Sequence, residues 1–470
     1  MKKVMRILIT WLLLICMLVP LFAGCDLVDK IIGSKDSEAA DTSSSETDAE
    51  TTTTPATTTK APKPDTPYPS TALQKNAYIL GKTEKDALSY KVGEEIRFDI
   101  RLTDSGNTSA TYPCSRFVWT VEADDGQTWS GSKRGDNGRL TLGFTMNKPG
   151  AICVTVKAYD HTGAEMTNVK PFVGGAFAGF EQIKTGVACP SDFDAFWQRQ
   201  LSILDQYAPE IIEKTAVGTS ASYDVYSVKI RSHQEDAPVT GYVTIPKNAA
   251  PGSLKIKLCF SGYNASMGKP VPQYTSGHIT FVVNAHSMEN GQNEAYYNNL
   301  KNSLGQFGFS AADYADPSTS YFRNMILRDV QALRYAKSLP EWNGKNIELS
   351  GGSMGGFQAT AVAALEPGVT KLSVHIVWMC DVGGRSVGRM DGWLPEYTAN
   401  LNYFDSVNFA ARITCPTTIS RAGLVDFTTT PIGVAAYYNA LQGTKSILFV
   451  QSGDHLNDPK LPAGRYQRWG

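Results

Sequence analysis

The second half of the chain alternates short apolar runs with longer stretches in which apolar residues return every three or four positions. From Tyr223 onward, the runs with the length and composition of buried strands are residues 225–231, 239–245, 254–261, 279–284, 347–350, 372–379, 417–421 and 446–451. Helical periodicity lies between them, at residues 322–338, 357–365 and 432–441. Strands that alternate with helices favour a mostly parallel sheet with helices on both faces. The pattern therefore predicts an α/β domain, which we place at residues 178–470.

Residues 73–177 show a different pattern, in which apolar and polar residues alternate over short runs. The clearest runs are residues 95–102, 117–121, 140–144 and 152–158, with Gly- and Asp-containing turns between them. This alternation predicts a small antiparallel β-sandwich of immunoglobulin-like style. Tyr112, Trp119 and Trp129 could form a platform for stacking sugars, but aromatic residues at alternate strand positions are more often core residues.

The N-terminus has the pattern of an export signal. Lys2, Lys3 and Arg6 precede an apolar run at 7–22, and small residues then lead to Cys25. The arrangement resembles a bacterial lipoprotein signal, in which the cysteine is lipidated and becomes the mature N-terminus. We therefore expect a signal at residues 1–25 and a lipid anchor on Cys25, as the chain's contact with the membrane. An ordinary secretory signal and an uncleaved anchor helix remain alternatives, and both also export the chain.

Residues 26–72 are rich in Ser, Thr, Pro and Asp/Glu and contain few strongly apolar residues. Such a segment buries too little surface to offset the entropy of ordering it, so we predict a disordered stalk. The stalk would separate the anchored Cys25 from the folded part of the chain.

Composition excludes several classes of partner and site. The 470 residues are enough for more than one domain, and 44 Lys+Arg against 45 Asp+Glu give a net charge of −1. Because no basic field exists, we expect no nucleic-acid partner. The cysteines outside the signal show no Cys-x-x-Cys spacing, so we expect no metal site. Export permits disulfides, and Cys114 with Cys153 is the pair that we would test first.

The most informative motif is a Gly-x-Ser-x-Gly pentapeptide between a strand and a helix. The apolar run 347–350 leads into Gly351-Gly352-Ser353-Met354-Gly355, and an Ala-rich helical stretch follows at 357–365. This context predicts a nucleophile elbow, whose sharp turn exposes the Ser353 hydroxyl above the sheet. The Met354 backbone N–H would then face the carbonyl oxygen of a substrate as its negative charge develops. A glycine-rich turn with an incidental serine is the alternative.

A serine nucleophile needs a histidine base, which follows it in the chain in α/β-hydrolases. Two histidines follow Ser353. His375 lies inside the apolar run 372–379, so we expect a core residue. His455 lies in a polar loop directly after the strand 446–451, where it can reach over the sheet edge. We therefore identify His455 as the base.

The acid and the second oxyanion donor follow from similar reasoning. Asp426 comes just past the strand 417–421 and is our choice for the acid. Asp381 stands one strand too early, and Asp454 is better explained as a residue that turns its loop. The oxyanion hole needs a second N–H from the loop after an early strand, and we assign it to Tyr263, with Gly262 allowing a close approach. A simple turn at this position is the alternative.

With these parts in order, the chain resembles the acetyl xylan esterase and cephalosporin C deacetylase family of α/β-hydrolases, carbohydrate esterase family 7. The resemblance runs from about Cys189 to near the C-terminus. It rests on Pro190-x-Asp192-Phe193-Asp194-x-Phe196-Trp197, Gly262-Tyr263-Asn264, Asn290-Gly291-Gln292, residues 328–333 and 338–342, Cys415-Pro416 and Leu424-Val425-Asp426. Two positions depart from the family: Met354 stands where Gln is usual, and Asn290 stands where Arg is usual.

The resemblance implies deacetylation of acetylated sugars, with Ser353, Asp426 and His455 as the triad and Tyr263 and Met354 as oxyanion donors. The partner would be an acetylated plant polysaccharide or oligosaccharide, and no metal or organic cofactor is needed. Family members commonly form ring-like oligomers, and the extra N-terminal part leaves that state open for this chain. The alternatives are a feruloyl or glucuronoyl esterase, a peptidase, or a non-catalytic glycan-binding lipoprotein.

Overall fold

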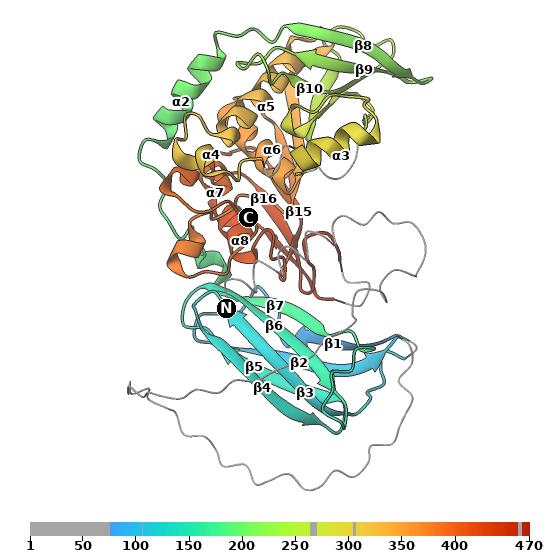
Figure 1. Cartoon of the computed structure of the whole chain (residues 1–470), viewed down its shortest axis with the longest axis vertical. Helices are drawn as coiled ribbons and strands as arrows, with labels where there is room; N and C mark the ends of the chain where they lie inside the picture. The colour runs from blue at the N-terminus through green and yellow to red at the C-terminus, as the bar shows by residue number, and fades with distance from the viewer. Residues whose placement is uncertain (1–75, 106, 264–269, 304–306, 459–462) are drawn as a thin grey trace, which may run out of the picture. The chain divides into compact units, whose positions relative to one another are not determined.

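The computed structural model describes residues 76–105, 107–263, 270–303, 307–458 and 463–470 (Figure 1). Contacts along the chain separate two units, Met1–Pro67 and Tyr68–Gly470, and all described residues belong to the second unit. The expected signal, the lipidation site Cys25 and the stalk at 26–72 lie outside the described residues. Among the helices that the structure describes, none is both long enough and apolar enough to cross a membrane.

The N-terminal part consists of two antiparallel sheets, which confirms the predicted β-sandwich. The strands are β1 (Ala77–Thr83), β2 (Glu95–Asp104), β3 (Cys114–Ala123), β4 (Thr128–Gly135), β5 (Arg139–Thr145), β6 (Gly150–Tyr159) and β7 (Phe172–Ala178). One sheet has the order β1-β2-β5 and the other β4-β3-β6-β7. Aromatic rings from the two sheets meet between them: Phe98 lies 6.3 Å from Phe172, and Trp129 lies 5.3 Å from Phe144, between ring centroids.

The alternation that predicted these strands follows the burial of their side chains. In β2, Ile96 and Phe98 are buried while Arg97 and Asp99 between them are exposed, as the two-residue period of a strand requires. Tyr112, Trp119 and Trp129 are partly buried against the core. Their packing agrees with the core interpretation of these aromatic residues.

Cys114 and Cys153, the pair that we would test first for a disulfide, are not bonded to each other. Both cysteines are free and buried. The antiparallel register of β3 with β6 places Cys153 opposite Glu122, near the end of β3, whereas Cys114 begins that strand. The two sulfur atoms therefore lie at opposite ends of neighbouring strands, too far apart for a bond. Burial raises the pKa of both thiols to about 12.

The C-terminal part is built on one ten-stranded mixed sheet. Its order is β17-β16-β15-β14-β13-β11-β12-β10-β9-β8, and the neighbours from β16 to β12 are parallel. The strands are β8 (Ile211–Thr219), β9 (Tyr223–Ile230), β10 (Val239–Pro246), β11 (Leu254–Phe260), β12 (His278–Val283), β13 (Trp342–Gly352), β14 (Lys371–His375), β15 (Thr417–Gly423), β16 (Lys445–Val450) and β17 (Arg465–Trp469). The predicted α/β-hydrolase sheet is confirmed, and β8 and β17 extend it beyond the predicted strands.

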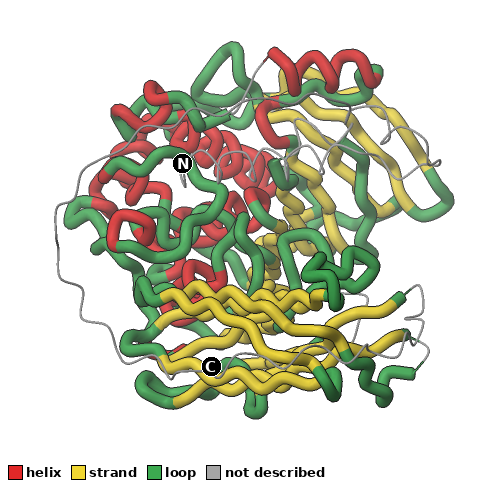
Figure 2. Tube along the Cα trace, turned by 60° about the horizontal axis from the view of Figure 1, so that its bottom comes forward, coloured by secondary structure: helices red, strands yellow, loops and turns green. Residues whose placement is uncertain are grey.

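Helices pack against this sheet and against one another (Figure 2). The α-helices are α2 (Phe193–Leu204), α3 (Glu294–Ser303), α4 (Ala311–Ala315), α5 (Tyr321–Ser338), α6 (Met354–Leu365), α7 (Ser406–Ala410) and α8 (Pro431–Ala440). The short 3₁₀ helices are η1 (Phe180–Gln182), η2 (Ala285–Ser287), η3 (Gly384–Val387) and η4 (Ala399–Phe404). Helix α2 contacts α5, which contacts α6, and α7 contacts both α6 and α8, so these five helices are linked to one another.

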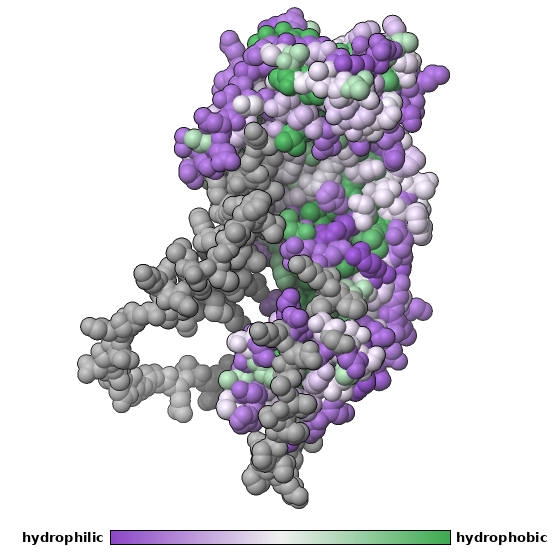
Figure 3. Space-filling view, turned by 90° about the vertical axis from the view of Figure 1, so that its right-hand side faces the viewer, coloured by the Kyte–Doolittle hydropathy of each residue, from purple (hydrophilic) through white to green (hydrophobic). Residues whose placement is uncertain are grey.

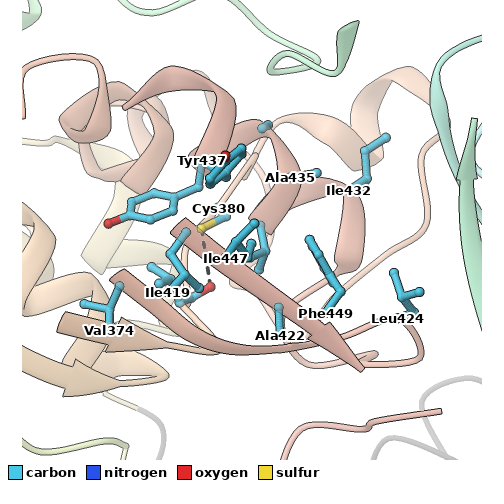
Figure 4. Packing of buried hydrophobic residues seen from close by; sticks show 14 of the residues in the cluster. Val374, Cys380, Ile419, Ala422, Leu424, Ile432, Ala435, Tyr437, Ile447 and Phe449 are labelled. Atoms are coloured by element: carbon cyan, nitrogen blue, oxygen red, sulfur yellow. Dashed lines mark hydrogen bonds between the residues drawn. The ribbon is translucent and has the colours of Figure 1, made fainter. Parts of the chain in front are cut away.

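The hydrophobic core extends from the ten-stranded sheet to helix α8 and to the strands of the sandwich. On the helical side, Ala435 and Tyr437 of α8 lie close to Ile419 of β15 and Ile447 of β16 (Figure 4). On the same face of β16, the ring of Phe177 in β7 lies 5.2 Å from that of Phe449. Apolar residues also reach the surface between larger polar areas on one face (Figure 3). The sandwich and the α/β part therefore share one core.

Candidate active site

The predicted elbow stands between β13 and α6. Ser353 has φ 54° and ψ −121°, a conformation that a non-glycine residue adopts only at a cost. A Cβ atom added to Gly351 would lie 2.2 Å from the carbonyl oxygen of Gly355, and one added to Gly355 would lie 2.2 Å from that of Phe260. Gly351 and Gly355, which begin and end the pentapeptide, are thus required because the chain passes too closely for a side chain.

The backbone around Ser353 is held by two hydrogen bonds, one to the last residue of β14 and one to the segment that follows this strand. The Ser353 N–H donates to the carbonyl oxygen of His375 at 3.1 Å, and the Ser353 carbonyl oxygen accepts from the Trp378 N–H at 3.1 Å. These bonds fix the strained residue on both sides and therefore fix the direction of its hydroxyl.

The structure brings Ser353, His455 and Asp426 together in one line of hydrogen bonds. The Nε2 atom of His455 lies 3.1 Å from the Oγ of Ser353, and the Nδ1 atom lies 2.9 Å from the Oδ2 of Asp426. Asp426 is fully buried, and His455 is 8% exposed. This is the arrangement in which an imidazole can take a proton from a serine hydroxyl while a carboxylate orients the ring.

Asp426 is itself held by the Thr-rich loop that follows it. Its Oδ1 accepts from the backbone N–H groups of Thr428 and Thr429 at 2.8 and 2.9 Å, and its Oδ2 accepts from the Thr429 hydroxyl at 2.7 Å. One oxygen therefore anchors the loop while the other faces the imidazole. The sequence showed the threonines but not that the Thr429 hydroxyl shares an oxygen with His455.

The two competing acids have other roles. Asp381 forms an ion pair with Arg389 and accepts from the Gly186 N–H at 2.7 Å. The Oδ1 of Asp454 accepts from the N–H groups of Leu456 and Asn457 at 2.9 and 2.6 Å, so this residue turns its own loop. The geometry thus favours Asp426 over both.

The expectation that His375 is a core residue is wrong. Strand β14 ends at His375 instead of continuing to 379, and the chain turns sharply at Ile376, where φ is 41°. The His375 side chain is exposed, and its ring lies beside the elbow, since a Cβ on Gly352 would lie 2.1 Å from its Nε2. The apolar residues after His375 belong to the turn and the loop beyond it.

The two predicted oxyanion donors lie on either side of the elbow. Met354 is the first residue of α6, so its N–H has no acceptor within the helix. Tyr263 follows β11, and a Cβ on the preceding Gly262 would lie 3.7 Å from the carbonyl oxygen of Gly352. That distance places the loop next to the elbow. It also shows that crowding does not require a glycine at 262, contrary to the reason given from the sequence.

Four aromatic residues pack together beside these donors, and we call them the aromatic wall: Tyr263, Phe309, Trp378 and Trp393. The ring of Trp393 lies 5.0 Å from Tyr263, 4.8 Å from Phe309 and 5.3 Å from Trp378, between centroids. The Trp378 Nε1–H donates to the Trp393 carbonyl oxygen at 2.6 Å. The wall was missed by sequence reasoning, because its members come from separate segments and share no motif.

Arg421 of β15 is a second residue that the sequence did not reveal. Its guanidinium donates to the carbonyl oxygens of His455 at 3.1 Å and Asp454 at 2.8 Å, and to the Asp458 carboxylate at 2.7 Å. The side chain thereby holds the loop that carries the imidazole. An isolated arginine in a strand gives no local signal of such a role.

The comparison with known families identifies the family of the chain. A family model for acetyl xylan esterases matches residues 179–390 and 395–469. The chain belongs to the acetyl xylan esterase family. It is therefore an esterase that hydrolyses carboxylic esters, and the resemblance noted from its motifs is confirmed.

Individual relatives of this esterase carry the same kind of name. The acetyl esterase Axe7A of Xylanibacter ruminicola is 27% identical over 388 residues, which are 78% of this chain and 84% of that protein. An acetyl xylan esterase from Paenibacillus sp. R4 is 22% identical, with a TM-score of 0.49 over 60% of this chain and 94% of the other. Acetyl xylan esterase 1 from Thermoanaerobacterium sp. JW/SL YS485 is 21% identical, with a TM-score of 0.49 over 60% and 93%.

Proposed function

We propose that this esterase is an exported serine hydrolase that removes acetyl groups from acetylated xylan or xylo-oligosaccharides. The observation that carries the proposal is the line of hydrogen bonds from Ser353 through His455 to the buried Asp426. Family membership supports acetyl ester hydrolysis, and the names of the relatives support xylan as the acetylated polymer.

In the first half of the reaction, the Ser353 oxygen attacks the acetyl carbonyl carbon while its proton passes to the Nε2 of His455. The carbonyl oxygen becomes negative and accepts hydrogen bonds from the Met354 and Tyr263 N–H groups. Asp426 stabilises the imidazolium. When the tetrahedral intermediate collapses, the bond to the sugar oxygen breaks, and His455 gives its proton to that oxygen.

The second half repeats these steps with water. The acetyl group is now bound to Ser353, and His455 takes a proton from a water molecule that attacks the acyl carbon. Collapse of the second tetrahedral intermediate releases acetate and returns the proton to the Ser353 oxygen. Every proton is carried by His455, so no metal or organic cofactor is needed.

The aromatic wall supports a preference for a small acyl group. Tyr263 supplies a proposed oxyanion N–H, and its ring contacts Trp393, so the wall begins at the reacting atoms. Trp378 is fully buried, and its backbone N–H donates a hydrogen bond to the Ser353 carbonyl oxygen. We infer that these rigid rings border the acyl site, where they favour acetyl over the larger feruloyl group.

Release of acetate from acetylated xylan tests the proposed substrate. We expect the wild-type chain to release acetate from acetylated xylan and its oligosaccharides, and to hydrolyse a feruloyl ester at least about tenfold more slowly by kcat/KM. Quantifying acetate and ferulate in parallel, with matched ester concentrations, checks this. Faster release of ferulate, or binding of xylan without release of acetate, would refute the proposed substrate.

We also propose that the esterase is anchored outside the cytoplasm by a lipid on Cys25. The proposed organisation is a signal at 1–25, a stalk at 26–72, a sandwich at 73–177 and the esterase part at 178–470. The support is the sequence of the N-terminus, in which basic residues, an apolar run and small residues precede Cys25.

The variant Cys25→Ala tests this anchor. Wild-type chain isolated from bacterial membranes should carry lipid on its N-terminal peptide by mass spectrometry. Cys25→Ala should lack the lipid and lose the Cys25-dependent attachment to the membrane fraction. Cys16→Ala, which changes a cysteine inside the expected signal, is the matched control and should leave the lipidated product unchanged. An unmodified Cys25 in the membrane-bound wild type would contradict the proposal.

A further inference from the structure

The sandwich reaches the esterase part through the carboxylate of Asp124. This residue follows the end of β3 and is 7% exposed. Its Oδ2 accepts from the Ala151 N–H of β6 at 2.8 Å, and its Oδ1 accepts from the Met390 N–H of the esterase part at 2.8 Å. A buried carboxylate therefore ties one strand of the sandwich to one backbone position in the segment after η3.

Met390 lies three residues before Trp393 of the aromatic wall. The Trp393 N–H donates to the carbonyl oxygen of Thr428 at 3.1 Å, in the loop that holds the triad acid. Gly392 lies between Met390 and Trp393 in the chain, and a Cβ atom on it would lie 3.0 Å from the same carbonyl oxygen of Thr428. The segment from Met390 to Trp393 is thus short and closely packed, and we infer that a shift at Met390 moves the Trp393 ring.

The residue on the other side of Met390 is fixed as well. Arg389 forms an ion pair with Asp381 and donates to the Lys184 carbonyl oxygen at 2.8 Å. Arg389 and Trp393 thus bond to other residues of the esterase part, and the Met390 N–H between them is the group that bonds to the sandwich.

A second contact joins the sandwich to the strands that carry the acid and the base. Gly175 of β7 donates its N–H to the Gln451 carbonyl oxygen at 3.0 Å and accepts from the Gln451 Nε2 at 3.3 Å. A Cβ on Gly175 would lie 2.5 Å from the Leu424 carbonyl oxygen. Leu424 and Gln451 directly follow β15 and β16, so the sandwich touches the chain just before Asp426 and His455.

From these contacts we propose that Asp124 is a positioning residue for the esterase reaction, which holds Trp393 in the aromatic wall and thereby restricts the acyl group to acetyl. The inference rests on the proposed serine mechanism at Ser353. It gives the sandwich a role in catalysis: its loop after β3 is part of the support of the acyl-binding wall. Asp124 itself touches neither the substrate nor the triad.

Removal of the carboxylate should change acyl selectivity. In Asp124→Ala, the N–H groups of Met390 and Ala151 lose their acceptor, so the Met390–Trp393 segment relaxes away from the site. We expect kcat/KM for p-nitrophenyl acetate to fall about tenfold, because a displacement near 1 Å is costly for a reacting geometry. The ratio of butyrate to acetate hydrolysis should rise several-fold, because the wall no longer excludes the longer chain.

The experiment compares p-nitrophenyl acetate, propionate and butyrate for the full chain and its variants. Asp125→Asn is the matched control, since that neighbouring carboxylate accepts from the Gln127 and Asn147 N–H groups within the sandwich. It should keep the wild-type ratio. Trp393→Leu should raise the ratio in the same direction as Asp124→Ala. Asp124→Asn keeps the shape and one acceptor oxygen and should give a smaller shift in the same direction.

Several outcomes would overturn the proposal. One is a wild-type ratio of butyrate to acetate hydrolysis in a folded Asp124→Ala, and another is the same result in Trp393→Leu. A third is a change of this ratio in Asp125→Asn that equals the change in Asp124→Ala. If Asp124→Ala does not fold, Asp124→Asn decides: a shifted ratio supports the role of Asp124, and an unchanged ratio refutes it. Full activity in Ser353→Ala would instead remove the proposed mechanism, whatever the Asp124 variants do.

Discussion

Replacement of Ser353 by alanine is expected to lower kcat for acetyl esters by at least about 10⁴-fold, or about 5.5 kcal/mol of transition-state stabilisation. The Oγ atom that lies 3.1 Å from the Nε2 of His455 is removed, so no acyl-enzyme can form. The loss should appear without unfolding. Alanine has the same backbone requirement as serine at φ 54°, and the hydrogen bonds to His375 and Trp378 involve only the backbone of residue 353.

Ser350→Ala is the matched control for this prediction. Ser350 lies three residues earlier in β13, and its hydroxyl donates to the Leu258 carbonyl oxygen at 3.3 Å, away from the triad. We expect its activity to stay close to that of the wild type. Initial rates on p-nitrophenyl acetate and thermal unfolding curves of both variants check the prediction. Activity of Ser353→Ala within tenfold of the wild type would show that the reaction does not pass through this oxygen.

The elbow could be predicted from the sequence because its physics is local. A strand, a strained serine and an α-helix follow one another within a few residues, and the glycines are required by contacts across the turn. The strands β10 to β16 were recognisable for a similar reason, since their apolar runs are buried in the sheet. Chain order then placed Asp426 and His455 behind the nucleophile, where the structure brings them together.

The missed elements lack such a local signal. Every residue of β8 is exposed, so neither an apolar run nor an alternation of burial marks that strand. Strand β17 is short and polar and pairs only with β16. His375 was misassigned because the apolar run around it continues past the end of β14, and a sequence does not show where pairing stops.

The least predictable features depend on segments that are distant in the chain. The aromatic wall joins four such segments. Arg421 bonds to the backbone of His455, which lies 34 residues later in the chain. The Asp124 contact with Met390 crosses 266 residues. No spacing rule links these positions, since only the three-dimensional packing of the sandwich and the sheet brings them together.

Replacement of Asp426 by asparagine is the second large effect that we expect, a fall in kcat of about 10³–10⁴-fold. If the amide oxygen keeps the N–H groups of Thr428 and Thr429, its NH₂ group must face the Nδ1 of His455. That nitrogen then has to accept a hydrogen bond, so the proton moves to Nε2. An imidazole with its proton on Nε2 cannot accept the proton of Ser353.

The opposite orientation of the amide in Asp426→Asn is unfavourable as well. With its oxygen toward His455, the NH₂ group would point at two N–H donors of the Thr-rich loop, a repulsive contact inside a fully buried site. Asp454→Asn is the matched control, because the Asn oxygen can still accept from the Leu456 N–H and turn the loop. Its kcat should stay near that of the wild type, and both variants should be assayed over pH 5–9 on p-nitrophenyl acetate. If Asp454→Asn lost activity as strongly as Asp426→Asn, or if Asp426→Asn stayed fully active, the orienting carboxylate would not be Asp426.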